Sequence, residues 1–293
     1  MPGSEQSYIN SINLKADTEF PYLVLEVVGG HSYPLNPGFR VMHWHEDLQY
    51  IYVLDGTIHI QTLNDEIELQ RGDGIFINKQ VVHLVKQMDA CHYMSFVFPE
   101  YILKFYPGCP ANALTNNLIE REHILFCHFP KHQSWCEPIL DKLQKLASME
   151  KNKPEFYEYE VMLNLFSLIL LTQKNHRLFP VKADDVISMR MRRFLAFIEE
   201  RYGNDVTLDA LAKSASVSKS ECLRCFKLSM QTTPYRYLME YRLLKATQLL
   251  SQTNQPIGTI SSLVGFNQMS QFGKCFKKKI GCTPREYRKR ALQ

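Results

Sequence analysis

The stretch VGFNQMSQFGKCF, residues 264–276, decides the fold of its region, because it joins the end of one predicted helix to the start of another. A glycine, Gly265, followed two residues later by Asn267 is typical of a chain that leaves one helix and begins the next. The four residues from Gln268 to Gln271 carry no charge, yet they offer amides, a hydroxyl and a thioether. Such side chains at a helix start can contact a partner, so the stretch indicates a binding element.

The unit that contains this stretch occurs twice. FKLSMQTTPYRY (226–237) and FKKKIGCTPREY (276–287) share Phe-Lys, Thr-Pro and Tyr at a constant offset of 50. Further upstream, Leu211 and Ile260 match at an offset of 49. The second copy therefore has one extra residue just after its turn.

Each copy predicts a short helix, a tight turn and a longer helix, at about 207–229 and 256–280. Thr207, Ser218 and Asn267 are suitable N-caps, since their side chains can accept hydrogen bonds from first-turn N–H groups. This arrangement is the helix-turn-helix, whose second helix enters the major groove of DNA.

The candidate DNA contacts follow from this geometry. They are Asn267, Gln268, Met269, Ser270, Gln271, Lys274 and Lys277 in the second copy, and Lys219, Ser220, Leu223, Arg224 and Lys227 in the first. The amides and hydroxyl suit base edges, Met269 suits a thymine methyl group, and Arg224 suits guanine. Lys227 and Lys277 are expected to contact phosphates. A single such motif would equally fit an ordinary solvated helix face; two copies favour DNA binding.

Charge divides the chain in the same way. From Asp184 to the C-terminus there are 19 Lys and Arg against 9 Asp and Glu, so +10, whereas the remainder carries 15 against 21, so −6. A basic region joined to an acidic one indicates nucleic-acid binding by one part only. A solvated basic surface would give the same count.

IGTISSLVGFNQMSQFGKCFKKKIGCTPREYRKR, residues 257–290, resembles the C-terminal signature of the AraC-type (AraC/XylS family) transcription regulators. That pattern runs I-x-x-I-A-x-x-V-G-F and then F-x-x-x-F-K-x-x-x-G-x-T-P-x-x-Y-R. The chain departs from it at Ser261, where Ala is usual, and at Ser216 and Gln231, where the first copy often has Gly. The resemblance implies an all-α double helix-turn-helix domain over 184–293.

The acidic part contains short β-rich runs, HWHEDLQYIYVLDG (43–56) and GDGIFINKQVVHLV (72–85), bounded by Gly and Asp. They predict an all-β barrel or sandwich over 1–100, with CHYMSFVFPE (91–100) as its last strand. Alternation places His43 and His45 on one face, and His83 can join them.

These histidines have two interpretations. The pattern resembles the metal-binding cupin motif H-x-H-x-x-x-E…H, which makes a metal-dependent cupin enzyme with an accessory nucleic-acid domain the alternative function. Gln49 stands at the carboxylate position and is a poor anionic ligand, so we expect no resident metal, no cofactor and no catalysis.

The favoured interpretation is an effector pocket, because AraC-type regulators often carry a cupin-like barrel that binds a small molecule. By position, the lumen residues are Phe39, Arg40, Val41, His43, His45, Gln49 and His83. The expected ligand is a sugar or another polar metabolite. Taken singly, each of these residues also fits ordinary core packing.

The segment 101–183 predicts helices around 135–149 and 155–173. The second helix is apolar almost all round from Val161 to Leu171, which suggests burial against its own domain and against a second subunit. Burial within one subunit fits the same pattern, but the favoured interpretation is a helical dimerisation segment.

The whole sequence thus predicts a cytoplasmic multidomain α and β transcription regulator that is not an enzyme. Its expected partners are double-stranded DNA, a small-molecule effector, the transcription machinery and a second copy of the chain. The N-terminus lacks the pattern of a signal peptide, and the apolar block 161–171 is too short to span a membrane. The eight cysteines are expected to be reduced, buried thiols.

Overall fold

The structure is a computed structural model that describes residues 9–10, 15, 18–34, 42–62, 66–87, 90–119, 124–175, 186–230 and 232–291. It divides into two compact units, Met1–Met189 and Arg190–Gln293. The division falls inside helix α4 (Val186–Arg201), a few residues beyond the boundary expected at 184.

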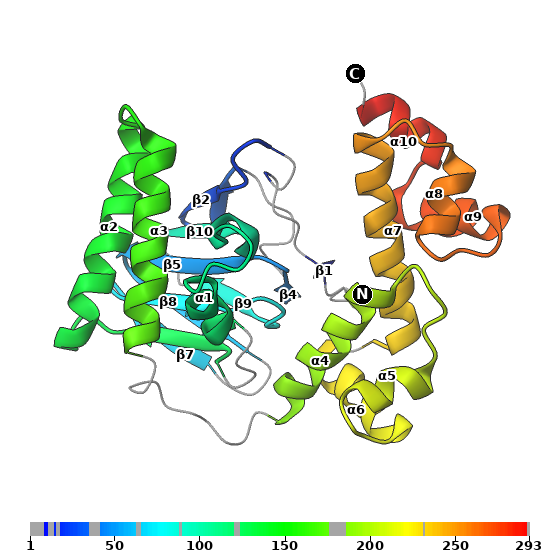
Figure 1. Cartoon of the computed structure of the whole chain (residues 1–293), viewed down its shortest axis with the longest axis horizontal. Helices are drawn as coiled ribbons and strands as arrows, with labels where there is room; N and C mark the ends of the chain where they lie inside the picture. Colours follow the sequence, from blue (N-terminus) through cyan, green and yellow to red (C-terminus); the bar gives the residue numbers. More distant parts are fainter. Residues whose placement is uncertain are drawn as a thin grey trace. The chain divides into compact units, whose positions relative to one another are not determined.

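The N-terminal unit is built on antiparallel β-sheets (Figure 1). Its strands are β1 (Ile9–Asn10), β2 (Leu23–Val28), β3 (His31–Tyr33), β4 (His43–Trp44), β5 (Leu48–Asp55), β6 (Thr57–Gln61), β7 (Glu66–Gln70), β8 (Gly74–Ile77), β9 (Leu84–Gln87), β10 (His92–Phe98) and β11 (Phe126–Phe129). A six-stranded sheet has the order β11-β8-β5-β10-β2-β3, and a three-stranded sheet has the order β7-β6-β9. β1 and β4 pair separately in parallel. The expected β fold is confirmed in its sandwich form, because among the described residues these sheets do not close into one barrel.

Alternation along β5 shows how the six-stranded sheet is covered on both faces. Tyr50 and Tyr52 belong to the core cluster that includes the helices, whereas Ile51 and Val53 belong to the cluster between the sheets. Gln49, next to Tyr50, therefore points to the side between the sheets. A polar side chain at that depth requires partners.

Helices cover the outer face of the six-stranded sheet. They are α1 (Asn112–Ile119), α2 (Glu137–Asn152) and α3 (Tyr157–Lys174), with short 3-10 turns at Glu100–Leu103 and Ser134–Cys136. α2 and α3 lie side by side over the sheet in Figure 1. Both predicted helices are confirmed. The prediction that β10 is the last strand is wrong, because β11 pairs with β8 at the sheet edge.

The C-terminal unit is all α, as expected. It contains α4, α5 (Leu208–Ser214), α6 (Lys219–Met230), α7 (Pro234–Gln252), α8 (Ile257–Leu263), α9 (Met269–Ile280) and α10 (Pro284–Ala291). The starts of α5 and α8 differ by 49 positions and those of α6 and α9 by 50. The extra residue of the second copy therefore lies in its turn.

Helix α7 separates the two copies and packs against both (Figure 1). Leu243, Ala246 and Leu250 of α7 are buried in the core of the second copy. Tyr237 and Tyr241 are buried as well, and the Tyr237 ring lies tilted against that of Phe226 of the first copy, with ring centroids 5.8 Å apart. α7 is thus buried on two sides rather than amphipathic.

Among the helices in the described ranges, none combines the length and apolar composition needed to cross a membrane.

Candidate functional site

The two helix-turn-helix motifs share their local design. Thr207 caps α5 by accepting a hydrogen bond from the Ala210 N–H at 3.1 Å, and Ser218 accepts one from the Glu221 N–H at 3.2 Å before α6. Each turn contains one residue in the left-handed region, Ser216 with φ +55° and Gly265 with φ +83°. The serine thus adopts the conformation that glycine adopts in the second copy.

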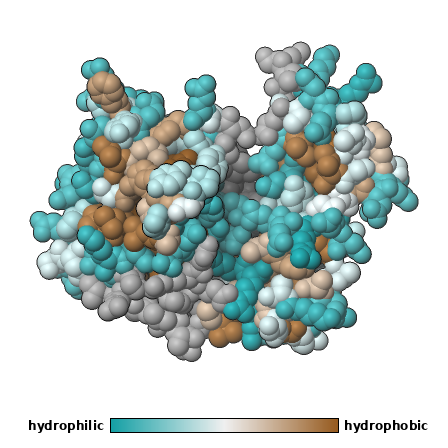
Figure 2. Space-filling view, viewed as in Figure 1, coloured by the Kyte–Doolittle hydropathy of each residue, from teal (hydrophilic) through white to brown (hydrophobic). Residues whose placement is uncertain are grey.

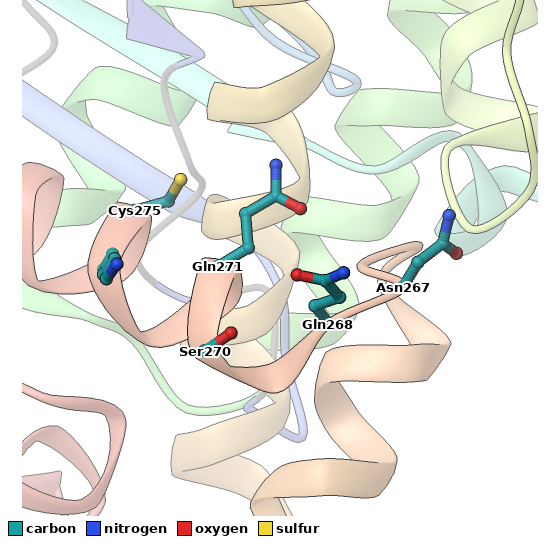
Figure 3. A pocket seen from close by; sticks show the side chains of 6 residues that line it. Asn267, Gln268, Ser270, Gln271 and Cys275 are labelled. Atoms are coloured by element: carbon teal, nitrogen blue, oxygen red, sulfur yellow. The ribbon is translucent and has the colours of Figure 1, made fainter.

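The second motif presents its polar residues outward. Phe272 and Phe276 are fully buried on one face of α9. On the opposite surface lie the exposed candidate contacts Asn267, Gln268, Met269, Ser270, Gln271, Lys274 and Lys277. Most of them line a shallow groove together with Cys275, and Figure 3 shows the amide side chains extending from the N-terminal end of α9. The sequence predicted this surface correctly as exposed.

The start of α9 differs from the prediction in one respect. Gln268, not Asn267, is the N-cap residue, and its side chain makes no capping hydrogen bond. The extra turn residue moves Asn267 one position too far from the helix to cap it. The first-turn N–H groups of α9 are therefore left without a side-chain acceptor at the N-cap, where the positive end of the helix dipole favours an anion.

The first motif has a different surface. Lys219, Ser220, Leu223, Arg224 and Lys227 are all exposed on or near α6, as expected. Arg224, however, donates from Nε and Nη2 to the two carboxylate oxygens of Glu221, each at 2.7 Å. Arg190 of α4 donates to the same carboxylate.

This network fixes the charge state of Glu221. Its bond to Arg224, helped by the charge of Arg190, lowers the pKa of Glu221 to about 2. The Nη1 edge of Arg224 takes no part in the bidentate pair with Glu221, so the guanidinium is oriented but keeps donors for another acceptor. Glu221 is not among the residues predicted from the sequence, although its i, i+3 spacing to Arg224 indicates this pair.

Lys219 is also engaged within the protein. Its Nζ lies 3.3 Å from Asp209 of α5, which also binds Lys213 at 2.8 Å. Hydrogen bonds from both lysines lower the pKa of Asp209. The first motif thus holds much of its charge in internal ion pairs.

Comparison with known proteins agrees with both units. A family model described as a helix-turn-helix domain matches residues 211–290, and one described as a cupin domain matches residues 31–97. A solved transcriptional regulator with an AraC-type DNA-binding domain, from Chromobacterium violaceum, is 30% identical; the match covers 36% of this chain and 93% of that chain, with a TM-score of 0.35. The chain belongs to the AraC-type transcription regulators.

Relatives of this AraC-type chain extend over both units. YdeC, an HTH-type transcriptional regulator of Bacillus subtilis (strain 168), is 28% identical over 260 residues, 86% of this chain and 87% of YdeC. The melibiose operon regulatory protein of Escherichia coli (strain K12) is 22% identical over 284 residues, 94% of this chain and 90% of that protein.

The N-terminal unit of the AraC-type chain brings three predicted residues together. His43 and His83 form a β-bridge with two backbone hydrogen bonds of 2.9 Å, and His45 follows β4 directly. All three side chains are buried, His83 completely. Phe39, Arg40 and Val41 were also predicted here, but they lie outside the described residues.

Hydrogen bonds fix the orientation of two of these rings. His45 Nδ1 lies 2.8 Å from the Asp47 carbonyl oxygen, and His83 Nδ1 lies 2.9 Å from the Val81 carbonyl oxygen. A carbonyl oxygen can only accept, so both Nδ1 atoms carry a proton and donate it. The Gln49 side-chain oxygen, Oε1, lies 3.0 Å from His45 Nε2.

Gln49 joins the cluster to β10 through its other amide atom, which lies 2.7 Å from Ser95 Oγ. Its Oε1 faces His45 Nε2 and its Nε2 donates to Ser95 Oγ, so the amide is held at both ends. Gln49 is therefore held in place and fills the position of a cupin carboxylate ligand without its charge.

His83 Nε2 is different, because this buried atom has no hydrogen-bond partner among the described residues. Burial, together with His43 and His45, holds the pKa of His83 well below its ordinary value of 6.5. The ring is therefore neutral, with an unused lone pair facing the interior.

Six of the eight cysteines are buried free thiols, as expected, whereas Cys109 and Cys275 are only partly buried. Burial raises the pKa of Cys222 to about 12 and also raises that of Cys225. Protonated thiols of this kind are poor metal ligands.

Proposed function

We propose that this AraC-type chain reads DNA mainly through α9, with α6 beside it. A polar effector held in the N-terminal unit regulates this DNA binding. The observation that carries the DNA-reading proposal is the exposed, uncharged polar start of α9, opposite the buried Phe272 and Phe276. Amide and hydroxyl groups at this point of a second helix suit base edges. Lys277, farther along α9, suits a phosphate.

The test is salt-dependent binding of the full chain to duplexes selected from a random pool. We expect one preferred sequence and an affinity that falls steeply with salt. Lys277→Ala should weaken all duplexes alike and reduce the salt slope by roughly 0.9, the value for one lost phosphate contact. Lys151→Ala, an exposed lysine at the end of α2, is the control. Equal affinity for every duplex would contradict the proposal.

The effector proposal concerns the space between the sheets. His43, His45, Gln49 and His83 offer hydrogen-bonding atoms at this depth, and Phe39, Arg40 and Val41 remain candidate contacts. A relative named for the melibiose operon supports a sugar or a similar polar metabolite. The effector would act by favouring one conformation of the chain over another. A small molecule that copurifies with the chain, detected by mass spectrometry, would identify it.

The dimer proposal concerns α3. Leu165 and Leu168 are fully buried in their own unit, so they cannot form a subunit interface. Tyr159, Leu163 and Leu170 are exposed to 70%, 51% and 38% on another face of α3. Figure 2 shows hydrophobic residues gathered over this region. An exposed apolar face of this kind supports contact with a second copy.

Sedimentation of a Leu163→Glu/Leu170→Glu variant tests the dimer, because neither residue belongs to the buried core. We expect the variant to be a folded monomer under conditions where the unchanged chain is a dimer. An unchanged chain that is monomeric at micromolar concentration, with and without DNA, would contradict the proposal.

We also propose that the chain is not an enzyme and that it acts in the cytoplasm together with the transcription machinery. Membership in a family of transcription regulators supports this, and so does Gln49, which replaces the anionic ligand of the enzyme motif. The metal-dependent cupin enzyme remains the second candidate because the three histidines converge. Turnover of a small metabolite by the metal-loaded chain would favour it.

A further inference from the structure

The carboxylate of Glu221 joins two helices of the C-terminal unit, because arginines of both α4 and α6 donate to it. Its Oε1 accepts from Nη1 of Arg190 and from Nη2 of Arg224. The Cys225 thiol donates to the same oxygen over 3.7 Å, and Nε of Arg224 donates to Oε2 over 2.7 Å. The carboxylate is thus held by three side chains, one of which lies outside the helix-turn-helix motif.

Packing between the helices brings Arg190 to this point. Phe194 of α4 and Phe226 of α6 are both fully buried, and their rings stack with centroids 5.7 Å apart. Residues four positions apart share one face of a helix. The face of α4 that buries Phe194 therefore also directs Arg190, one turn earlier, toward α6.

The three charged side chains run from partly buried to exposed. The side chains of Arg190 and Glu221 are 29% and 23% exposed, whereas that of Arg224 is 51% exposed. An exposed ion pair within one helix contributes little by itself, because solvent screens it and both side chains lose freedom. A carboxylate that a second partner already holds has lost that freedom. Arg190 therefore anchors Glu221, and Glu221 orients Arg224.

The pair with Glu221 determines which donors Arg224 presents outward. A guanidinium group carries five N–H donors in a planar fork. Nε and one N–H of Nη2 face Glu221, so the end of the fork, with Nη1 and the other N–H of Nη2, is directed away from it. Two N–H groups on one edge match the O6 and N7 acceptors of guanine.

Arg190 also sets the charge of this group. Two guanidinium groups and one carboxylate carry a net charge of +1, whereas the pair of Arg224 and Glu221 alone is neutral. A positive group is attracted to the phosphates of DNA and a neutral one is not. The arginine on α4 thus keeps the oriented Arg224 favourable for an approach to DNA.

We propose that Arg190 is a positioning residue for base recognition, which acts through Glu221 on Arg224 and does not itself contact DNA. This inference rests on the proposed function, since it requires that the first motif reads DNA. It adds α4 to the elements that set sequence specificity. No residue of α4 is among those expected from the sequence to lie at the DNA interface.

The experiment uses the full chain, the duplex that it prefers, and duplexes changed at single positions. Arg224→Ala identifies the base pair that Arg224 reads, where discrimination should fall by about 5- to 150-fold. Arg190→Met should lower discrimination at the same base pair by at least about twofold, the least expected for partners in one ion-pair network. It should leave the salt slope unchanged, whereas a lost phosphate contact would lower the slope by roughly 0.9.

Two single variants control for charge and for folding. Arg190→Lys keeps the positive charge and a donor for Glu221, so it should restore most of the discrimination. Arg201→Met removes an arginine at the other end of α4, which pairs with the adjacent Glu200, and it should change no preference at this base pair. Circular dichroism checks that each variant folds. Arg190→Gln, which is uncharged but polar, repeats the test if the methionine variant does not fold.

A double variant separates positioning from a merely structural role. If Arg190 acts through Arg224, adding Arg190→Met to Arg224→Ala should have no further effect on discrimination. A structural role would instead lower stability and affinity equally in both backgrounds. Equal losses with and without Arg224 would therefore overturn the proposal.

Three further results would overturn it. They are unchanged discrimination in a folded Arg190→Met chain, a reduced salt slope in that chain, and an Arg224→Ala chain that loses preference at no base pair. If the unchanged chain still prefers one duplex in these cases, DNA reading by α9 stands and only the role of Arg190 is lost. If the unchanged chain prefers no duplex, the proposed function fails, and the role of Arg190 fails with it.

Discussion

The two helix-turn-helix motifs have nearly the same backbone and very different surfaces. In the first, Arg224 and Lys219 are held by Glu221 and Asp209 of the same chain. In the second, the corresponding surface is uncharged at its start and exposed. One architecture thus supports two ways of approaching DNA: an oriented arginine in α6, and adaptable amides in α9.

The largest expected effect tests the turn of the second motif. A Cβ at Gly265 would lie 2.7 Å from the Tyr202 carbonyl oxygen, and φ there is +83°. Gly265→Ala should lower the free energy of unfolding by more than the roughly 1–3 kcal/mol that backbone strain alone would cost. Gly281→Ala is the matched control, because φ is +85° and a Cβ meets nothing within 4 Å. Thermal unfolding followed by circular dichroism measures both; equal losses would mean that the close approach to Tyr202 is unimportant.

The next effect concerns base reading by α9. Gln271→Ala should lower affinity for the preferred duplex by about 1 to 3 kcal/mol and relax the preference at one base pair. Competition with duplexes changed at single positions measures this, and Gln144→Ala on α2 is the control. A loss spread evenly over all duplexes would assign Gln271 to the phosphate backbone instead.

A smaller effect sharpens the contrast at the first motif. Glu221→Gln removes the charged partner that orients Arg224, so we expect weaker discrimination at one base pair. Affinity for unrelated duplexes should rise at the same time, because a negative charge leaves a surface that faces phosphates. With a pKa of about 2, Glu221 is fully charged in assays near neutral pH.

The control for that variant is Glu240→Gln, which removes a charge from α7 and from its pair with Lys279. It should change discrimination at no single base pair. If Glu221→Gln behaves in the same way as Glu240→Gln, Arg224 does not read a base through its present orientation.

The smallest effect makes the first turn resemble the second. Ser216 is exposed and has φ +55°, which costs a residue with a side chain roughly 1–2 kcal/mol. Ser216→Gly should therefore stabilise the chain by about 0.5–1 kcal/mol after the extra freedom of unfolded glycine is subtracted. Chemical denaturation measures this gain, and a destabilised variant would show that the serine side chain supports the turn.

Local signals explain why the C-terminal unit was predictable. Helix caps, a turn residue with positive φ and a repeated Phe-Lys and Thr-Pro pattern act within a few residues of one another, and the duplication doubles the signal. The convergence of His43, His45 and His83 was also predictable in part, because strand alternation places i and i+2 on one face.

Interactions between distant residues explain the rest. A helix that is apolar all round, such as α3, carries no periodic signal for which face is buried, so Leu165 could not be told from Leu163. β11 is short, and it pairs with residues of β8, such as Phe76, that lie about fifty positions earlier in the sequence. The unpartnered nitrogen of His83 depends on the Val81 carbonyl and on its neighbours, which only the folded chain defines.

Helix α7 makes the spacing of the two reading helices a property of the fold. Because this helix of 19 residues packs against both motifs, it holds them at a fixed spacing. One residue inserted in α7 would turn one motif relative to the other by about 100° and shift it by roughly 1.5 Å. We therefore expect base substitutions in a DNA site to be tolerated. Base pairs added or deleted between the two halves of the site would misalign those halves with the two reading helices.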